Sequence, residues 1–274
     1  MNVTVVDAGK VSECKLEITH LVTVGCSWTY CQGLENITRD GWPGLVAREL
    51  NIPLVNLGTP GVGNDNIHRR TYEYLYQNLP TNSNPLFIIA WSQPWRKEAW
   101  FEGHGTAPIK RLFSEYNVVS MPEDKPQNHY ESALLENWDE EDFYRKTLLH
   151  KLSLINLFKA NNVPYLMTNF CSHLPPIKVM NKINTHYGNM WDTMINDPGK
   201  ITDFYKISNE LPKLPCGHEG IEGNRVIADY SISEIKKHFT DYNFVNHKPY
   251  LSLDHFLLGQ KYSKKFPEWC DFKL

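Results

Sequence analysis

Ser27 is the first residue whose position in the sequence points to chemistry. It comes two residues after Gly25, where an apolar, β-branched run that begins at Leu21 ends. Such a run, bounded by glycine, is typical of a buried strand in a parallel sheet, and open α/β sheets bind ligands beyond the carboxyl ends of such strands. A serine hydroxyl placed there could act as a nucleophile if a base accepts its proton. The alternative is a simple strand-to-helix turn in which Ser27 caps the next helix.

His218 is the side chain best suited to be that base. An imidazole has an unperturbed pKa of about 6.5, so its neutral form can accept a proton near neutral pH. His218 lies in a glycine-rich loop between Gly217 and Gly223, directly before an amphipathic segment that predicts a helix. A histidine at such a position can face a cleft, although it can also cap the helix that follows. Together with Ser27 it predicts nucleophilic catalysis, provided that the fold brings the two side chains together.

The order of these residues resembles that in the SGNH (GDSL-type) hydrolase superfamily. Gly25 and Ser27 match the first sequence block of the family, at the end of the first core strand. His218 and Gly223 match the last block, and the segment from Asn56 to Gly61 looks like the second. The resemblance implies an α/β fold, a three-layer α/β/α sandwich of flavodoxin-like architecture with a central parallel sheet, and the activity of a serine ester hydrolase.

The same resemblance assigns roles to individual residues. Ser27 would be the nucleophile and His218 the base. The backbone N–H groups of Ser27 and Gly61 would form the oxyanion hole, together with a side chain at the third block, either Ser92 or Gln93. The implied substrate is an acyl ester, for which a carbohydrate O-acetyl group is a candidate. Three tryptophans near the expected strand ends could form a substrate wall: Trp28, Trp91 and Trp95.

Several positions depart from the pattern of the family. Cys26 replaces an aspartate, Ser92 or Gln93 stands in place of an asparagine, and Cys216 or Pro215 stands where an acid is expected to orient the histidine. Cys216 is therefore a candidate orienting residue, and so are a main-chain carbonyl, a water or a distant carboxylate. These changes leave open a second function, a catalytically weakened SGNH fold that serves as a binding or structural module. A thiol nucleophile at Cys26 is disfavoured, because neighbouring side chains on a strand end point to opposite faces.

Strand and helix patterns alternate along the chain, which predicts a parallel sheet with helices on both faces. The expected strands are 21–25, 54–58, 86–91 and 163–169, and the expected helices are 42–50, 64–79, 143–160 and 225–239. We expect one domain over residues 1–274, with insertions at about 94–142 and 171–213 and an aromatic tail at 240–274. The insertions are candidates for a lid or a specificity wall.

Composition indicates which partners, cofactors and cellular location to expect. The chain has 28 basic and 31 acidic residues, and its formal charge of −3 offers no electrostatic footprint for nucleic acid or an anionic membrane. The six cysteines lack CxxC spacing, so we expect free thiols, no metal and no other cofactor. The chain begins without a signal-peptide pattern and has no apolar run of about 18 residues, which favours a cytoplasmic protein and leaves open packaging into a particle such as a virion. The sequence does not predict the oligomeric state.

Overall fold

A central parallel sheet organises the computed structural model, which describes residues 16–78, 83–94, 96, 140–170, 178, 181–182, 185 and 204–245. Its strands are β2 (His20–Gly25), β3 (Leu54–Asn56), β4 (Pro85–Trp91) and β5 (Tyr165–Asn169), in the order β3-β2-β4-β5. All three pairings are parallel. The four expected strands are thus confirmed, with ends that differ by at most two residues.

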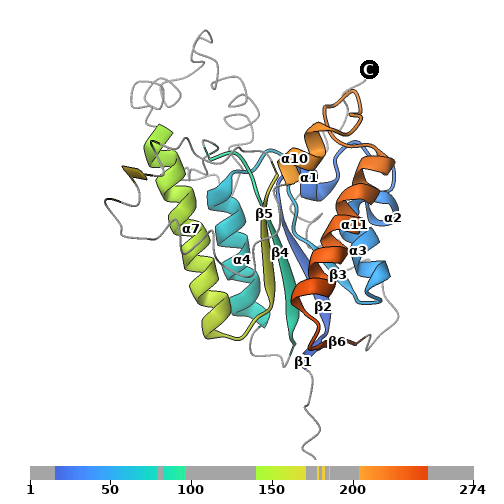
Figure 1. Ribbon diagram of the computed structural model, residues 1–274, viewed down its shortest axis with the longest axis horizontal. Coiled ribbons are helices and arrows are strands. Elements are labelled where there is room, and N and C mark those ends of the chain that lie inside the picture. Colours follow the sequence, from blue (N-terminus) through green and yellow to red (C-terminus); the bar gives the residue numbers. More distant parts are fainter. Residues whose placement is uncertain are drawn as a thin grey trace, which may run out of the picture.

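Helices cover both faces of this sheet (Figure 1). On one face lie α4 (Asn64–Asn78) and α7 (Glu140–Ala160), and on the other lie α3 (Trp42–Glu49) and α11 (Ile221–His238). The shorter helices are α1 (Ser27–Tyr30), α2 (Ile37–Asp40) and α10 (Phe204–Asn209). The expected fold class, an α/β/α sandwich around a parallel sheet, is confirmed.

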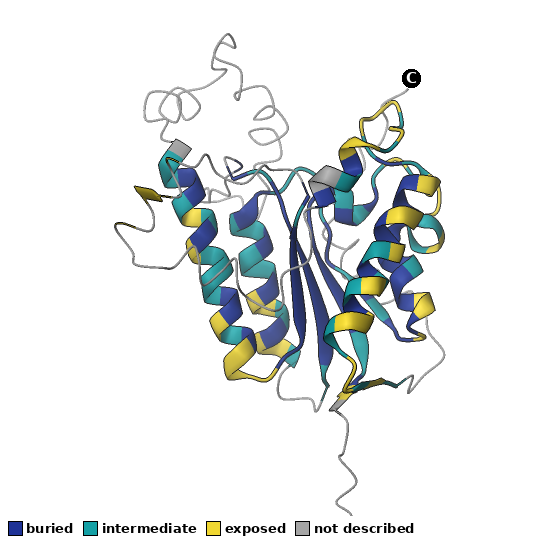
Figure 2. Ribbon diagram, viewed as in Figure 1, coloured by how far each residue is buried: buried dark blue, intermediate teal, exposed yellow. Residues whose placement is uncertain are grey.

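The sheet separates two hydrophobic cores. Strand β4 is buried at all seven positions, as expected of a central strand with helices on both sides. Its side chains alternate: Leu86 and Ile88 belong to the core under α3 and α11, whereas Phe87 and Ile89 belong to the core under α4 and α7. Figure 2 shows the buried sheet between the partly exposed helical layers.

The order of the strands defines where a ligand would bind. From β2 the chain continues to β3 on one side, and it then crosses to β4 on the other side of β2. The winding direction therefore reverses at β2, and open α/β sheets bind ligands at the carboxyl ends of the strands that flank such a reversal. Ser27 comes two residues after the end of β2, so it lies at this switch point.

A second, two-stranded parallel sheet pairs β1 (Leu16–Ile18) with β6 (Tyr242–Phe244). It was not expected from the sequence, because each strand has only three residues and the partners come from opposite ends of the chain. The described part of the chain contains no helix that is both long and apolar enough to cross a membrane. Most of the two expected insertions and most of the aromatic tail lie outside the described residues.

Candidate active site

Ser27 is the first residue of α1, and a sharp turn brings it there from β2. Gly25 permits this turn, since a Cβ atom on it would collide with the side chain of Thr29 and with the main-chain oxygen of Ala90 in β4. The N-cap residue of α1 is Cys26, which makes no side-chain cap hydrogen bond. Ser27 therefore does not cap the helix, and its hydroxyl can bind another partner.

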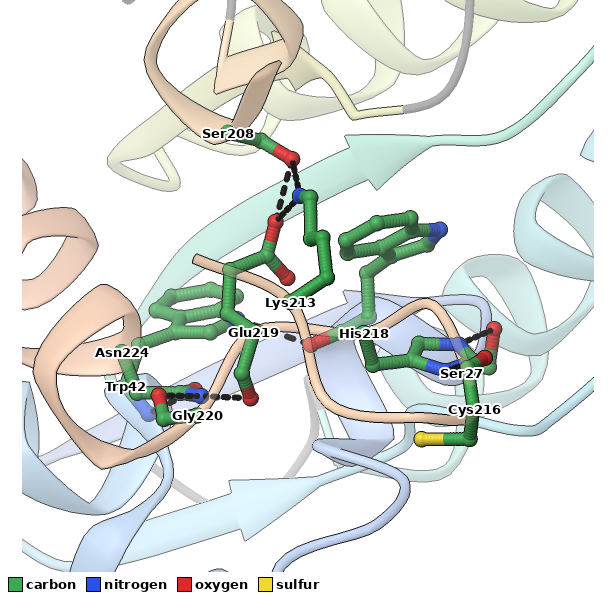
Figure 3. Close-up of polar contacts among 10 residues, drawn as sticks. Ser27, Trp42, Ser208, Lys213, Cys216, His218, Glu219, Gly220 and Asn224 are labelled. Atoms are coloured by element: carbon green, nitrogen blue, oxygen red, sulfur yellow. Dashed lines mark hydrogen bonds and ion pairs between the residues drawn. The ribbon is translucent and has the colours of Figure 1, made fainter. Parts of the chain in front are cut away.

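The partner of the Ser27 hydroxyl is His218, from the loop before α11 (Figure 3). Ser27 Oγ lies 2.8 Å from Nε2 of the imidazole. The N-cap position of α11 is Gly220, so His218 does not cap that helix either. The structure thus brings together the two side chains that the sequence singles out for chemistry.

The second ring nitrogen of His218 determines the tautomer. Nδ1 lies 3.1 Å from the main-chain oxygen of Cys216. A carbonyl oxygen can only accept a hydrogen bond, so Nδ1 must carry a proton. In the neutral ring Nε2 then has the lone pair, and the Ser27 hydroxyl donates to it. This is the protonation state in which an imidazole can act as a general base.

The thiol of Cys216 does not take part in this contact. Its Sγ lies 4.0 Å from the main-chain oxygen of Gln32, and the side chain is an exposed free thiol that points away from the imidazole (Figure 3). The residue at the expected acid position therefore contacts His218 through its backbone alone.

Burial lowers the pKa of His218 below its ordinary value. The hydrogen bond to the Cys216 carbonyl acts in the opposite direction, and the positive charges of Arg96 and Lys213 add to the lowering. The net effect keeps the ring neutral, and so able to accept a proton, at pH values below the ordinary histidine range.

The loop that carries His218 is closed by its own backbone. The Leu214 N–H donates to the main-chain oxygen of His218 at 2.7 Å, and the Gly217 N–H donates to the oxygen of Leu214 at 2.8 Å. At its base, Lys213 and Glu219 form an antiparallel bridge. This hairpin limits how far the imidazole can move relative to Ser27.

Glu219 fixes the hairpin through its side chain as well as its backbone. Its carboxylate is buried and accepts hydrogen bonds from Lys213 Nζ and Ser208 Oγ (Figure 3). Asn224 in α11 donates to the main-chain oxygen of Glu219 at 3.1 Å and accepts from the N–H of Trp42 in α3 at 3.0 Å. The carboxylate next to His218 in the sequence therefore stabilises the loop instead of orienting the ring, a role that the sequence does not reveal.

Of the two expected wall tryptophans that the structure describes, Trp28 lies beside His218. Its ring centroid is 4.8 Å from that of His218, and Lys213 Nζ lies 4.5 Å from the indole centroid. The expectation for Trp91 is wrong: it is 1% exposed and its position in β4 directs it into the core under α4 and α7. Trp95 lies outside the described residues.

The two expected backbone donors are Ser27 and Gly61, and neither N–H has a hydrogen-bond partner in the described part of the chain. Gly61 has a φ of 75°, and a Cβ atom on it would meet open space. Its loop packs on α1, because the Thr59 N–H donates to the Gly25 oxygen at 3.0 Å and a side chain at Gly58 would collide with the backbone of α1. The loop is thus held beside Ser27.

The third-block position is occupied by a buried polar cluster at the end of β4. Ser92 Oγ accepts a hydrogen bond from Arg96 Nη1 at 3.1 Å, and the Ser92 N–H donates to Asn64 Oδ1 at 2.8 Å. The amide oxygen of Gln93 is buried and has no hydrogen-bond partner among the described residues. Sequence reasoning missed Asn64 and Arg96, although the Gln93-Pro94 turn that folds Arg96 back over Ser92 is a signal that could have indicated the latter.

The contacts of the site do not favour Cys26 as an alternative nucleophile. Cys26 is fully buried, and it is the Ser27 hydroxyl that contacts His218. Burial also raises the pKa of the nearby Cys31 thiol, which makes that side chain unreactive. In the ranges that the structure describes, no three His, Cys, Asp or Glu side chains gather as a metal site.

No protein-family model matches the sequence, and no curated protein is similar to it in sequence. Among solved structures, a lipolytic protein of the G-D-S-L family from Desulfitobacterium hafniense DCB-2 is similar at 14% identity and a TM-score of 0.43, over 79% of this chain and 99% of that chain. The esterase EstA from Pseudoalteromonas sp. is similar at 14% identity and a TM-score of 0.46, over 80% and 97%. Axe2, an acetylxylan esterase from Geobacillus stearothermophilus, is similar at 14% identity and a TM-score of 0.43, over 81% and 96%.

Proposed function

We propose that the protein is a serine ester hydrolase of the SGNH type, with Ser27 as the nucleophile and His218 as the base. The observation that carries the proposal is the 2.8 Å contact between Ser27 Oγ and His218 Nε2. The Cys216 carbonyl supports it, because it holds the proton on Nδ1 and leaves the Nε2 lone pair for the serine proton. Nucleophile, base and orienting group are thus arranged in one line of contacts.

The reaction follows from these contacts. Ser27 Oγ attacks the ester carbonyl carbon while His218 Nε2 takes the hydroxyl proton, and the carbonyl oxygen becomes an oxyanion. The N–H groups of Ser27 and Gly61 would donate to this oxyanion. His218 then returns the proton to the leaving alcohol, and an acyl-enzyme forms. Water, deprotonated by the same imidazole, attacks the acyl group, and the imidazolium then gives that proton to Ser27 Oγ as the acid is released.

Among the residues that the structure describes, no carboxylate contacts His218, and we expect this to change the rate more than the mechanism. In a Ser-His-Asp triad, the carboxylate holds the imidazole tautomer and stabilises the imidazolium that forms. The Cys216 carbonyl supplies the first of these effects but carries no full negative charge to supply the second. Turnover is therefore expected, at a lower rate than a carboxylate would give.

The finer proposal concerns the substrate, an acyl ester and specifically a carbohydrate O-acetyl group. Trp28 supports it, since its half-buried indole lies beside His218 at a ring distance of 4.8 Å. The ring also stacks on Phe170 and contacts Lys213 Nζ, so a sugar would pack against the part of the indole that stays exposed. Hydrolysis rates on acetylated xylo-oligosaccharides, compared with p-nitrophenyl acetate and longer-chain p-nitrophenyl esters, test this assignment. Faster hydrolysis of the long-chain esters would contradict it.

A fluorophosphonate probe tests the activity itself, because an activated serine reacts with any electrophile that fits. Intact-mass measurement should show one adduct on the wild-type protein and none on Ser27→Ala. Ser153→Ala is a matched control, because Ser153 Oγ also lies near a histidine nitrogen, 3.3 Å from His68 Nε2, but belongs to α7 on the face of the sheet opposite α11. This variant should label like the wild type.

The opposite result would assign the chain to the second class of function. If the folded wild-type protein stays unlabelled, as Ser27→Ala does, then Ser27 is not activated. The fold would then serve as a binding or structural module.

A further inference from the structure

Ser92 and Ser27 both come just after the carboxyl ends of two neighbouring strands. Strands β2 and β4 are neighbours, and their last paired residues are Gly25 and Ala90, so each serine comes two residues after the same pair. Side chains alternate along β4, and Ala90 belongs to the core under α3 and α11. By the same alternation, the side chain of Ser92 would lie on the α3 and α11 face of the sheet, the face that carries His218.

The main chain of Ser92 is fixed by Asn64 at the start of α4. Asn64 Oδ1 accepts from the Ser92 N–H at 2.8 Å, and Asn64 Nδ2 donates to the Ser92 main-chain oxygen at 3.2 Å. Asn64 Nδ2 also donates to Thr147 Oγ1 in α7 at 3.0 Å. The Ser92 N–H is therefore used within the fold, and the hydroxyl is the remaining donor of this fully buried residue.

Arg96 determines which way that hydroxyl can donate. Its guanidinium is buried, and Nη1 lies 3.1 Å from Ser92 Oγ. Arginine has only donors, so the serine oxygen is the acceptor in this contact and its own proton must point elsewhere. No residue in the described part of the chain accepts that proton.

Arg96 is itself held against the loop between β3 and α4, which carries Gly61 and Gly63. A Cβ atom on Gly63 would collide with the main-chain oxygen and the Cβ of Arg96, so the absence of a side chain at Gly63 allows this contact. The Arg96 N–H donates to the Gln93 oxygen at 3.3 Å and closes the turn after β4. Arg96 thus lies between the loop that carries Gly61 and the end of β4, and its positive charge is among those that lower the pKa of His218.

We propose that the Ser92 hydroxyl is the third oxyanion donor and that Arg96 is the residue that positions and polarises it. This inference rests on the proposed ester hydrolysis. A cationic donor on Ser92 Oγ strengthens the O–H group as a donor, and it fixes the direction of the remaining proton. The serine–arginine pair would then supply the hydrogen bond that the family obtains from an asparagine side chain. No covalent bond changes at either residue.

The test measures kcat and KM for p-nitrophenyl acetate, and the labelling rate with a fluorophosphonate, in the full-length chain. Ser92→Ala should lower kcat by about 10²-fold with KM nearly unchanged, as for the loss of one oxyanion donor. Ser92→Thr keeps a hydroxyl and should retain most of the rate. Arg96→Met should lower kcat by at least about tenfold in the wild-type background and have little further effect in the Ser92→Ala background, because it acts through Ser92.

Three outcomes would overturn the inference: a wild-type kcat in Ser92→Ala, a wild-type kcat in Arg96→Met, or fully additive losses in the double variant. Circular dichroism and thermal unfolding show whether each variant is folded, and if Arg96→Met does not fold, the comparison of Ser92→Ala with Ser92→Thr decides. A merely structural role of Ser92 would lower Tm without lowering kcat per folded molecule. If the proposed ester hydrolysis itself is wrong, the wild-type protein will not be labelled at Ser27. That result can be told apart from an error in the Ser92–Arg96 inference, in which the wild type is labelled but the variants keep their activity.

Discussion

At the scale of single residues, a backbone oxygen orients the imidazole of the proposed base. The Cys216 carbonyl lies 3.1 Å from His218 Nδ1, and the carbonyl belongs to a loop whose own hydrogen bonds fix it. A main-chain oxygen is present whatever side chain the residue has. The usual signature of a triad, an acidic residue at a set spacing from the histidine, is therefore not required for the correct tautomer.

This arrangement predicts that the Cys216 side chain has little effect on activity. Cys216→Ala should keep kcat/KM for p-nitrophenyl acetate within about threefold of the wild type, whereas His218→Ala should lose about 10²–10⁴-fold, the usual contribution of a general base. Cys216→Asp should keep or raise the activity, since a carboxylate there could stabilise the imidazolium. If Cys216→Ala abolished turnover in a folded protein, the thiol would have a direct role.

The environment of His218 predicts the pH dependence of the reaction. Burial lowers the pKa of the ring, so the neutral, basic form persists to lower pH than for an exposed histidine. The acid limb of a kcat/KM profile, which reports the free enzyme, should therefore have its midpoint below about pH 6.5. A profile recorded from pH 4.5 to 8 checks this. A midpoint above 6.5 would indicate that an opposing negative charge dominates the site.

Sequence reasoning located the two side chains of the candidate site, Ser27 and His218, because each follows a local signal, a strand that ends in glycine and a glycine-rich loop. It could not find the partners of these side chains. The orienting group is a backbone oxygen, which no residue type reveals, and Arg96 and Asn64 join the site only through tertiary contacts. A polar residue within a predicted helix start, such as Asn64, looks like a cap until the neighbouring strand is in place.

At the scale of elements, the hairpin before α11 holds His218, the proposed base, in place. Its two ends are joined by the ion pair between Lys213 and the buried Glu219, and Ser208 in α10 shares the same carboxylate. The side chain of Lys213 is 29% exposed, whereas that of Glu219 is 3% exposed. The Lys213–Glu219 pair therefore connects the hairpin to α10, while the ammonium group of Lys213 stays in contact with solvent.

Glu219→Ala should destabilise the protein by about 2–3 kcal/mol, measured by urea unfolding. Removing one partner of a buried pair typically costs about 3–5 kcal/mol, and Lys213 can recover part of this by moving into water. Glu222→Ala, an exposed acidic residue in the first turn of α11, is the control and should change the free energy of unfolding by less than about 0.5 kcal/mol. Equal effects of the two substitutions would show that the pair does not hold the loop.

The core strands could be predicted because short continuous apolar runs are typical of parallel strands that are buried on both faces. The start of α11 was placed four residues too late, at Arg225 instead of Ile221. Its first turn carries the exposed residues Ile221 and Glu222, so the apolar periodicity begins later, and Gly220 offers no side-chain cap as a signal. The pairing of β1 with β6 depends on contacts between distant segments and leaves no periodic pattern.

At the scale of the whole molecule, the two faces of the sheet have different roles. The α3 and α11 face positions His218, whereas the α4 and α7 face contains a second group of titratable side chains away from the site. His68 of α4 stacks on His150 of α7 with ring centroids 4.6 Å apart. His68 Nε2 lies 3.3 Å from Ser153 Oγ, and Asp65 Oδ1 lies 3.6 Å from His150 Nδ1.

This histidine pair predicts that the fold loses stability in mild acid. Burial, and then the charge of His150, lower the pKa of His68 from 6.5 to about 4, while the charge of Asp65 acts in the opposite direction. Between these two pH values the unfolded chain binds a proton at this position and the folded chain does not. The free energy of unfolding must therefore fall as the pH falls from about 6.5 to about 4. Because the ring is partly exposed, we expect a loss of about 1–2 kcal/mol, below the full equivalent of the pKa shift.

The measurement is urea unfolding at a series of pH values from 7.5 to 4.5, for the wild type and for His68→Gln. Glutamine cannot take up a proton, so the variant should show a shallower dependence on pH, and the difference between the two curves should grow as the pH falls below about 6.5. Any remaining slope includes His218, whose pKa burial also lowers, so His218→Gln should flatten the curve separately and add to the effect of His68→Gln. Parallel curves for the wild type and His68→Gln would mean that the contact between α4 and α7 does not respond to pH through this residue.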